Sequence, residues 1–305
     1  MNLKNVLVLG STSFTASHIL YNLHDGYSFK RVGRDSDLVD VVFDVEKNKI
    51  ESLENEFDWA DVVINCLSNG DVDSCEKNPE KSTVLNLEFP IELCKQAKIF
   101  DFHLIHFSSN AVYDGDQPVY TELSEHQPVN IYGRLKSEAD LYLKKELDKC
   151  TVLRPITMYG QLLGKQRHNP FSYFFDQLLD NKNIVAVNDV YVNMLHVDIL
   201  VQCVAKVIDE NIYDEFNISG DDIVNRFEFV SEIKRYLPTS TSSIEQTDSS
   251  KFITAARRPL DTSFDNSKMK SILGVYPKKL SPTIEILVQE ALLQSQSKGG
   301  VMKVA

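Results

Sequence analysis

The chain of 305 residues lacks long apolar stretches, an excess of positive charge and a regular cysteine pattern, and each absence argues against a class of protein. No apolar stretch reaches 18 residues, so a membrane-spanning helix is not expected. Lys and Arg (32) are outnumbered by Asp and Glu (44), and the net charge of -12 argues against nucleic acid or an anionic membrane as the main partner. The five cysteines are an odd number without metal-type spacing, so neither disulfides nor a structural metal are expected.

Short β-rich runs alternate with longer helical patterns in the first half, which is typical of parallel βαβ units. The expected strands are 6–9, 29–32, 61–66, 104–107 and 150–154, and the expected helices are 15–24, 80–98 and 132–149. Because the strands are continuously apolar, both faces of their sheet should be covered. These features predict an α/β fold, a Rossmann-type doubly wound parallel sheet with a smaller C-terminal lobe.

The second half is less regular and suggests how the chain divides. It begins with a predicted helix over 169–180, a strand over 184–187 and an apolar-periodic helix over 196–210. We expect residues 1–155 to form the first domain, with 184–215 returning to it, and residues 156–183 and 216–292 to form the smaller lobe. Residues 293–305 are expected to be a flexible tail. The N-terminus lacks a secretory signal, which favours a cytoplasmic protein.

One segment combines three side chains that together can protonate a carbonyl. The apolar run 104–107 leads to Ser109, and Tyr132 and Lys136 follow on a predicted helix. Residues four apart share a helix face, so the Lys136 ammonium can favour the ionised form of the Tyr132 phenol. Ser109, at the carboxyl end of a buried strand, can hold a carbonyl oxygen while the phenol donates its proton. The predicted chemistry is ketone reduction.

A turn of small residues follows the first predicted strand. It consists of Gly10, Ser11, Thr12, Ser13, Phe14 and Thr15. Small residues let the backbone approach a pyrophosphate, and hydroxyls can donate to it, although only the first glycine of a dinucleotide fingerprint is present and a plain strand-to-helix turn is the alternative. Arg34 after the second strand suits a 2'-phosphate, while Asp35 is adjacent. The sequence favours NADP(H), with NAD(H) also open.

With these motifs in place, the chain resembles the extended short-chain dehydrogenase/reductases, and most closely the dTDP-4-dehydrorhamnose reductase family. The resembling stretches are residues 62–66 with Val72-Asp73 and Asn86, residues 108–115, residues 130–136, and Ala256-Arg257-Arg258-Pro259 with residues 265–268. The order and spacing of these stretches, which span nearly the whole chain, carry the resemblance.

The resemblance implies an NAD(P)-binding Rossmann-type domain, a substrate-binding lobe and hydride transfer from a reduced nicotinamide to the 4-keto group of a nucleotide-linked 6-deoxy sugar. Tyr132 would be the proton donor, Lys136 would lower its pKa and hold the nicotinamide ribose, and Ser109 would bind the keto oxygen. Arg258 would meet the phosphates of the nucleotide-sugar substrate. Further expected contacts are Asp44, Cys66, Leu67 and Ser68 for the cofactor, and Asn110 and Asn169 for the substrate; a helix N-cap is the alternative role of Asn169.

Two stretches depart from the family pattern and leave alternatives open. Residues 154–160 are closer to nucleotide-sugar epimerases, and residues 188–193 replace a family segment beside the sugar. One alternative is therefore a nucleotide-sugar epimerase or dehydratase with tightly bound NAD. Another is a non-catalytic, NADP-binding regulatory subunit, similar to the regulatory beta subunit of methionine adenosyltransferase. A homodimer is compatible with the sequence.

Overall fold

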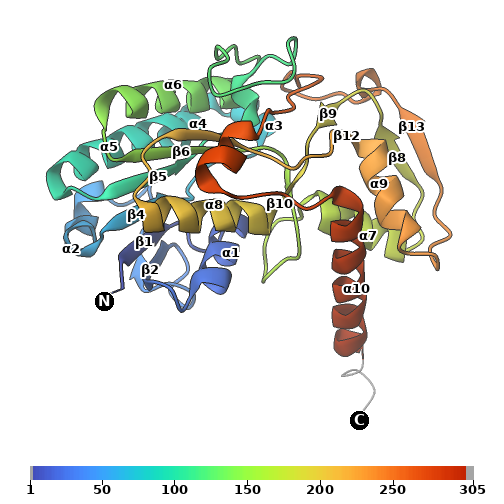
Figure 1. Ribbon diagram of the computed structural model, residues 1–305, viewed down its shortest axis with the longest axis horizontal. Coiled ribbons are helices and arrows are strands. Elements are labelled where there is room, and N and C mark those ends of the chain that lie inside the picture. Colours follow the sequence, from blue (N-terminus) through green and yellow to red (C-terminus); the bar gives the residue numbers. More distant parts are fainter. Residues whose placement is uncertain (1–2, 300–305) are drawn as a thin grey trace.

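A seven-stranded sheet forms the centre of the protein, whose computed structural model describes residues 3–299 (Figure 1). The strand order is β11-β6-β5-β4-β1-β2-β3, and every neighbouring pair is parallel. The strands are β1 (Asn5–Leu9), β2 (Ser28–Gly33), β3 (Val41–Val42), β4 (Val62–Asn65), β5 (His103–Phe107), β6 (Cys150–Pro155) and β11 (Glu215–Ile218). The predicted doubly wound α/β fold is confirmed.

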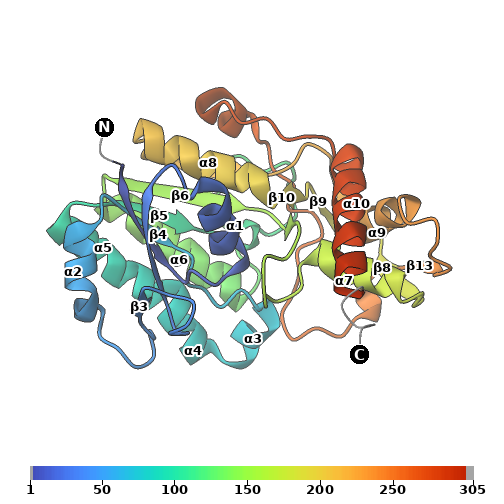
Figure 2. The ribbon, with the colours of Figure 1, turned by 90° about the horizontal axis from the view of Figure 1, so that it is seen from below.

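Helices cover both faces of this sheet. On one side lie α1 (Phe14–Leu23) and α8 (Val197–Glu210); on the other lie α2 (Glu54–Trp59), α3 (Val72–Lys77), α4 (Pro79–Thr83), α5 (Phe89–Phe100) and α6 (Ile131–Glu146) (Figures 1 and 2). Successive strand residues point to opposite faces, so Val6 and Val8 join the first layer's apolar core while Leu7 and Leu9 join the second.

A smaller lobe is built from the C-terminal half. Its elements are α7 (Pro170–Leu179), α9 (Arg226–Arg235), α10 (Leu280–Gly299) and two strand pairs, β8 (Ile184–Val187) with β13 (Ile244–Thr247) and β9 (Tyr191–Val192) with β12 (Val224–Asn225). Phe171, Phe229 and Ile284 lie in its own buried core. The pair β7 (Met158–Tyr159) and β10 (Leu195–His196) lies where the chain passes between the two parts.

The structure differs from the sequence-based expectation in how the chain is divided, in one helix and in the tail. The chain returns to the large domain with α8 rather than at residue 184, because β8 pairs with β13 inside the smaller lobe. Residues 216–218, expected in the smaller lobe, belong to β11 and pair with β6 in the central sheet. The predicted helix over 80–98 is divided by a π-helical turn at Val84–Glu88. The predicted tail is helical as far as Gly299, where α10 ends, and the rest of it lies outside the described residues.

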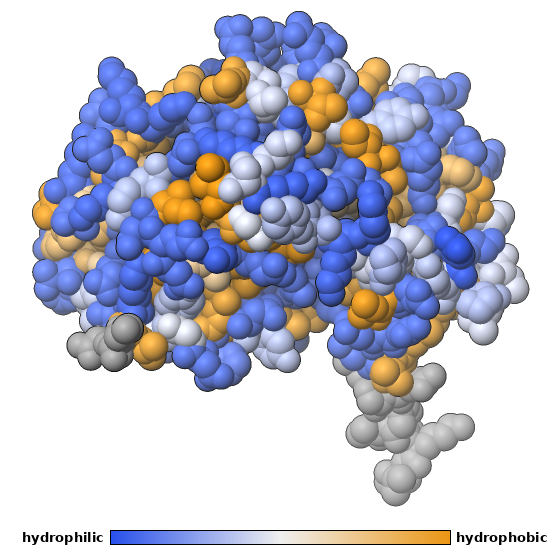
Figure 3. Space-filling model, viewed as in Figure 1, coloured by the Kyte–Doolittle hydropathy of each residue, from blue (hydrophilic) through white to orange (hydrophobic). Residues whose placement is uncertain are grey.

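The surface seen in Figure 3 is largely hydrophilic, with apolar side chains scattered among polar ones. Within residues 3–299, no helix combines the length and the apolar character needed to cross a membrane.

Candidate active site

Ser109 lies just beyond β5, at the carboxyl edge of the sheet. The strand is buried along its whole length, and the chain then forms a short 3-10 turn, Asn110–Val112. The Ser109 side chain caps this turn, because its Oγ accepts a hydrogen bond from the Ala111 amide at 3.2 Å. Only 8% of Ser109 is exposed, so its hydroxyl is held in a defined place.

Helix α6 can approach this turn because Gly133 has no side chain. A Cβ atom at Gly133 would lie 1.9 Å from the Ala111 carbonyl oxygen, far inside van der Waals contact. The close approach sets Tyr132, the preceding residue, near Ser109, and the Ser109 side chain is close enough to lower the pKa of the phenol. The absence of a side chain at Gly133 therefore determines the distance between two of the predicted catalytic groups.

The Tyr132 phenol keeps its proton at neutral pH. Burial raises its pKa, while hydrogen bonds with Ser109 and Ser68 oppose this rise, so the phenol is protonated at neutral pH. Ser68 is itself positioned by Asn86, whose Oδ1 accepts a hydrogen bond from the Ser68 hydroxyl at 2.8 Å. Asn86 is fully buried and thus acts on the site through the loop that carries Ser68.

Lys136 follows Tyr132 by one turn of α6 and is only 2% exposed. Its Nζ donates to the Phe107 carbonyl oxygen at 2.9 Å, at the end of β5. Burial lowers the pKa of its ammonium to about 8, and the charge of Asp140 opposes this fall. Lys136 is not among the groups that shift the pKa of Tyr132 in this structure, so the expected lowering of that pKa by Lys136 stays a prediction.

The turn after β1 has features that fit a dinucleotide. Gly10 has a φ of 73°, and a Cβ there would lie 3.1 Å from the Cys66 carbonyl, so glycine lets the turn pass close to the chain after β4. Ser13 caps α1 by accepting a hydrogen bond from the Ala16 amide at 3.3 Å. The buried Ser11 Oγ has no hydrogen-bond partner within residues 3–299, which leaves it available to a phosphate.

The other residues predicted to contact the cofactor lie around this turn. Phe14 and Thr15 form the first turn of α1, and Thr12 is exposed beside them. Leu67 is one of the side chains that a Cβ at Gly10 would meet, at 3.0 Å. Burial raises the pKa of the Cys66 thiol to about 12, so it is a neutral neighbour of the turn rather than a reactive thiolate.

Arg34 and Asp44 lie close enough at this edge to interact electrostatically. Arg34 is exposed and follows β2, and Asp44 follows the neighbouring strand β3 by two residues. A hydrogen bond from the Glu46 amide lowers the pKa of Asp44, and the charges of Lys47 and Arg34 act in the same direction. A cation and an acid are thus both present where a Rossmann-type site meets the adenosine ribose.

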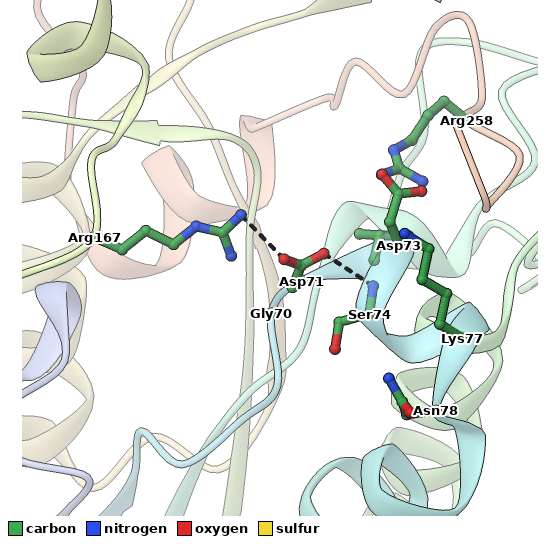
Figure 4. Close-up of a pocket in the computed structure, with 9 residues that line it drawn as sticks. Gly70, Asp71, Asp73, Ser74, Lys77, Asn78, Arg167 and Arg258 are labelled. Carbon is green, nitrogen blue, oxygen red and sulfur yellow. Dashed lines mark hydrogen bonds and ion pairs between the residues drawn. The ribbon is translucent and has the colours of Figure 1, made fainter. Parts of the chain in front are cut away.

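A pocket of about 420 Å³ opens beside α3 (Figure 4). It is lined by Gly70, Asp71, Val72, Asp73, Ser74, Lys77, Asn78, Arg167 and Arg258. Arg258 Nη2 lies 3.0 Å from Asp73 Oδ2, and Arg167 Nη2 lies 3.3 Å from Asp71 Oδ2. Arg258 thus lines the cavity, already paired with a carboxylate that an incoming anion would have to replace, and its contact with substrate phosphates stays a prediction.

The two predicted asparagines have different surroundings. Asn110 donates from Nδ2 to Thr262 Oγ1 at 2.6 Å and so joins the turn after Ser109 to the C-terminal segment. Asn169 is the N-cap of α7: its Oδ1 accepts from the amides of Phe171 and Ser172. The N-cap alternative is confirmed for Asn169, and its contact with substrate stays a prediction.

Sequence reasoning missed Arg167 and Lys77, the other two cations of the pocket. Arg167 belongs to a loop of the smaller lobe, whereas Lys77 ends α3 on the large domain. The available signal for Arg167 was its place two residues before the Asn169 cap, in a loop that connects the two parts. Nothing in the sequence joins that loop to residues 70–78.

The doubly wound sheet, the small-residue turn and the Ser-Tyr-Lys set at one edge define an extended short-chain dehydrogenase/reductase fold. A solved dTDP-4-dehydrorhamnose reductase from Bacillus anthracis, in complex with NADP, has the same fold with a TM-score of 0.84. It shares 20% identity with this chain, and the match covers 95% of this chain and 100% of that one.

The chain belongs to the family described as RmlD substrate binding domain, whose sequence model matches residues 4–293. Methionine adenosyltransferase 2 subunit beta from Pongo abelii is 24% identical over 282 residues, 88% of this chain and 82% of the relative. A probable low-salt glycan biosynthesis reductase, Agl14 from Haloferax volcanii, is 24% identical over 242 residues, 79% of each chain. The family resemblance predicted from the sequence is confirmed.

Proposed function

We propose that the protein is an NADPH-dependent reductase of a nucleotide-linked 4-keto-6-deoxy sugar. The observation that carries the proposal is that Ser109 lies close enough to Tyr132 to affect the pKa of its phenol, one helical turn from the buried Lys136, at the sheet edge that also holds the Gly10 turn. This set can bind and protonate a ketone oxygen, which is the chemistry that a reductase requires of its protein part.

Each residue of this set has a distinct role in the proposed reaction. A bound reduced nicotinamide would supply the hydride to the carbonyl carbon. Ser109 holds the keto oxygen, and Tyr132 donates its proton to that oxygen as negative charge develops on it. Lys136 contributes a nearby positive charge, which favours loss of the phenol proton, and donors for the ribose hydroxyls.

The turn and Arg34 support NADPH as the cofactor. The turn after β1 offers the Ser11 hydroxyl and the capped start of α1 to a pyrophosphate. Arg34 is exposed at the end of β2 and can form charge-assisted hydrogen bonds with a 2'-phosphate. The relative of the same fold from Bacillus anthracis was solved with NADP.

The pocket beside α3 supports a nucleotide sugar as the substrate class. Its cations, Arg258, Arg167 and Lys77, give an acidic protein a local site for a diphosphate. Asp71 and Asp73 now neutralise the two arginines, so binding would exchange carboxylate for phosphate oxygens. The planar guanidinium group of arginine can form paired hydrogen bonds with either carboxylate or phosphate oxygens.

A regulatory role is the second candidate, and it is favoured by one specific observation. Methionine adenosyltransferase 2 subunit beta matches 88% of this chain. In such a protein the cofactor site would serve stability or partner binding, and turnover would be absent. The residues of the Ser-Tyr-Lys set do not distinguish the two functions, because a fold and a site can both be retained without catalysis.

The deciding experiment begins with native mass spectrometry of the purified protein, which identifies any cofactor retained through purification. NADPH oxidation is then followed with a panel of nucleotide-linked 4-keto-6-deoxy sugars. Oxidation that requires a 4-keto sugar and is lost in Tyr132→Phe supports the reductase. Retained NAD with interconversion of nucleotide sugars and no net NADPH oxidation indicates an epimerase or dehydratase, and tight NADPH binding without turnover indicates the regulatory role.

A further inference from the structure

A buried polar network lies behind the three predicted catalytic residues, and Asp140 is at its centre. Asp140 follows Lys136 by four residues on α6, so Tyr132, Lys136 and Asp140 occupy successive turns on one face of the helix. Asp140 is only 2% exposed. Its Oδ2 accepts hydrogen bonds from Ser108 Oγ at 2.5 Å and from Arg154 Nε at 3.0 Å.

The second oxygen of Asp140 faces a histidine. Asp140 Oδ1 and His106 Nε2 lie 4.0 Å apart, and neither atom has a hydrogen-bond partner within residues 3–299. The Asn65 Oδ1 atom accepts from the Leu67 amide, which leaves the Asn65 Nδ2 group to donate toward His106 Nδ1 at 3.4 Å. This pattern assigns the ring proton of His106 to Nε2, directed at the carboxylate.

The ion pair with Arg154 does not by itself explain why a carboxylate is buried at position 140. Arg154 already has a second carboxylate, because its Nη2 donates to Glu215 Oε2 at 2.5 Å. Burial holds the pKa of His106 well below its ordinary value, so this ring is neutral. The buried cluster therefore contains two cations, Lys136 and Arg154, and without Asp140 only one anion would remain to balance them.

We propose that Asp140 is a positioning residue of the active site, whose buried carboxylate keeps Lys136 in its charged form and, through Ser108, holds the chain that presents Ser109. The inference deepens the proposed reductase function and rests on it for its catalytic meaning. The mechanism is electrostatic: a negative charge one turn away on α6 stabilises the ammonium in a setting where burial disfavours it.

The other groups around Lys136 are neutral or lie farther along the network. Cys75 of α3 and Cys66 after β4 are the other titratable groups that affect its pKa, and burial raises the pKa of both thiols, so they are uncharged at neutral pH. From β5, the neutral His106 faces it. Arg154 of β6 is not among the groups that shift the pKa of Lys136. Asp140 is therefore the one anion with this role among the described residues.

The test measures the protonation of Lys136 directly and does not depend on turnover. The protein is labelled with lysine carrying ¹³C at Cε, and the Lys136 signal is identified as the one missing in Lys136→Arg. Its titration midpoint is then compared in the parent protein and in Asp140→Asn. We expect a parent midpoint near 8 and a decrease of about one pH unit or more in the variant.

Matched variants separate the electrostatic role from a merely structural one. Glu138→Gln removes a negative charge from the exposed face of the same helix and should leave the midpoint unchanged. Asp140→Glu keeps the charge and should restore the midpoint toward that of the parent. Should Asp140→Asn fail to fold because Arg154 loses a partner, the double variant Asp140→Asn/Arg154→Gln removes that cation too, and the midpoint should still fall.

The outcomes are distinguishable. A Lys136 midpoint that is the same in Asp140→Asn or the double variant as in the parent would overturn the proposal, as would an equal decrease in Glu138→Gln. In an active enzyme, the alkaline limb of the pH profile of NADPH oxidation should move to lower pH in Asp140→Asn. If the parent showed no NADPH oxidation with any substrate, the reductase function would fail while the labelled titration still decided the role of Asp140.

Discussion

Replacing Gly133 with alanine would test whether the approach of α6 to the Ser109 turn sets the active-site geometry. The new Cβ would lie 1.9 Å from the Ala111 carbonyl oxygen and 2.8 Å from its carbon. Because real Cβ atoms are essentially never closer than 3.0 Å to another heavy atom, the helix and the turn must separate by about 1 Å. Both segments are backbone, so a side-chain rotation cannot relieve the contact.

Two effects on stability oppose each other in this variant. Alanine is favoured over glycine in a helix interior by about 1 kcal/mol, which is an upper bound for Gly133 in the first turn of α6. Overpacking of a closely fitted site costs about 1–3 kcal/mol. The net loss of stability should therefore be small, and activity becomes the more sensitive readout. A displacement of about 1 Å between Ser109 and Tyr132 should lower turnover by a factor on the order of 100.

The assay compares the melting temperature and kcat of Gly133→Ala with those of the parent and of Gly26→Ala. Gly26 is a matched control, since the nearest atom to a Cβ there is the Leu23 carbonyl oxygen at 3.5 Å, an ordinary contact. We expect Gly26→Ala to retain activity. A Gly133→Ala enzyme with kcat within a few-fold of the parent would refute the link between this glycine and the catalytic distance.

Four further outcomes are expected. Tyr132→Phe should keep NADPH binding, measured by calorimetry, while kcat falls by a factor on the order of 100 or more, the scale of a lost general acid. Arg34→Ala should reduce the difference in binding free energy between NADPH and NADH by about 1–3 kcal/mol. If the parent protein bound NADPH and NADH with equal affinity, Arg34 would not be a 2'-phosphate ligand. Arg258→Ala should mainly raise KM for the sugar nucleotide, because the phosphates lie remote from the reacting carbonyl; an unchanged KM, or a loss confined to kcat, would contradict this contact. The rate should fall as pH rises through about 8, where Lys136 loses its charge.

The relative positions of the three predicted catalytic residues can be read from the sequence because they depend on local structure. Tyr132 and Lys136 share one helix, so their spacing of four fixes their common face without any knowledge of the tertiary fold. Ser109 follows a continuous apolar run, which is sufficient to place it at the end of a buried strand. The order of strands and helices in the first half follows from the same kind of local periodicity.

The features that the sequence misses depend on contacts between distant segments. Arg167 pairs with Asp71 across 96 positions of chain, and no local pattern indicates that pairing. Strand β8 is short and apolar, and a segment of this kind could belong to the central sheet or to the smaller lobe. Its place follows only from its pairing with β13. The proximity of Gly133 to Ala111 likewise appears only when the helix is packed on the turn.

The two pKa shifts in the site bear on the direction of the proposed reaction. Burial raises the pKa of Tyr132, so the phenol keeps its proton throughout the range in which Lys136 is charged, below about 8. A ketone reduction needs that protonated phenol as an acid, whereas the oxidation half-reaction of an epimerase or dehydratase needs the phenolate as a base. The phenol is therefore, at neutral pH, in the protonated form that a ketone reduction requires of its acid. An enzyme that oxidised a nucleotide-sugar alcohol with NADP⁺ faster at pH 7 than it reduced the ketone with NADPH would contradict this reasoning.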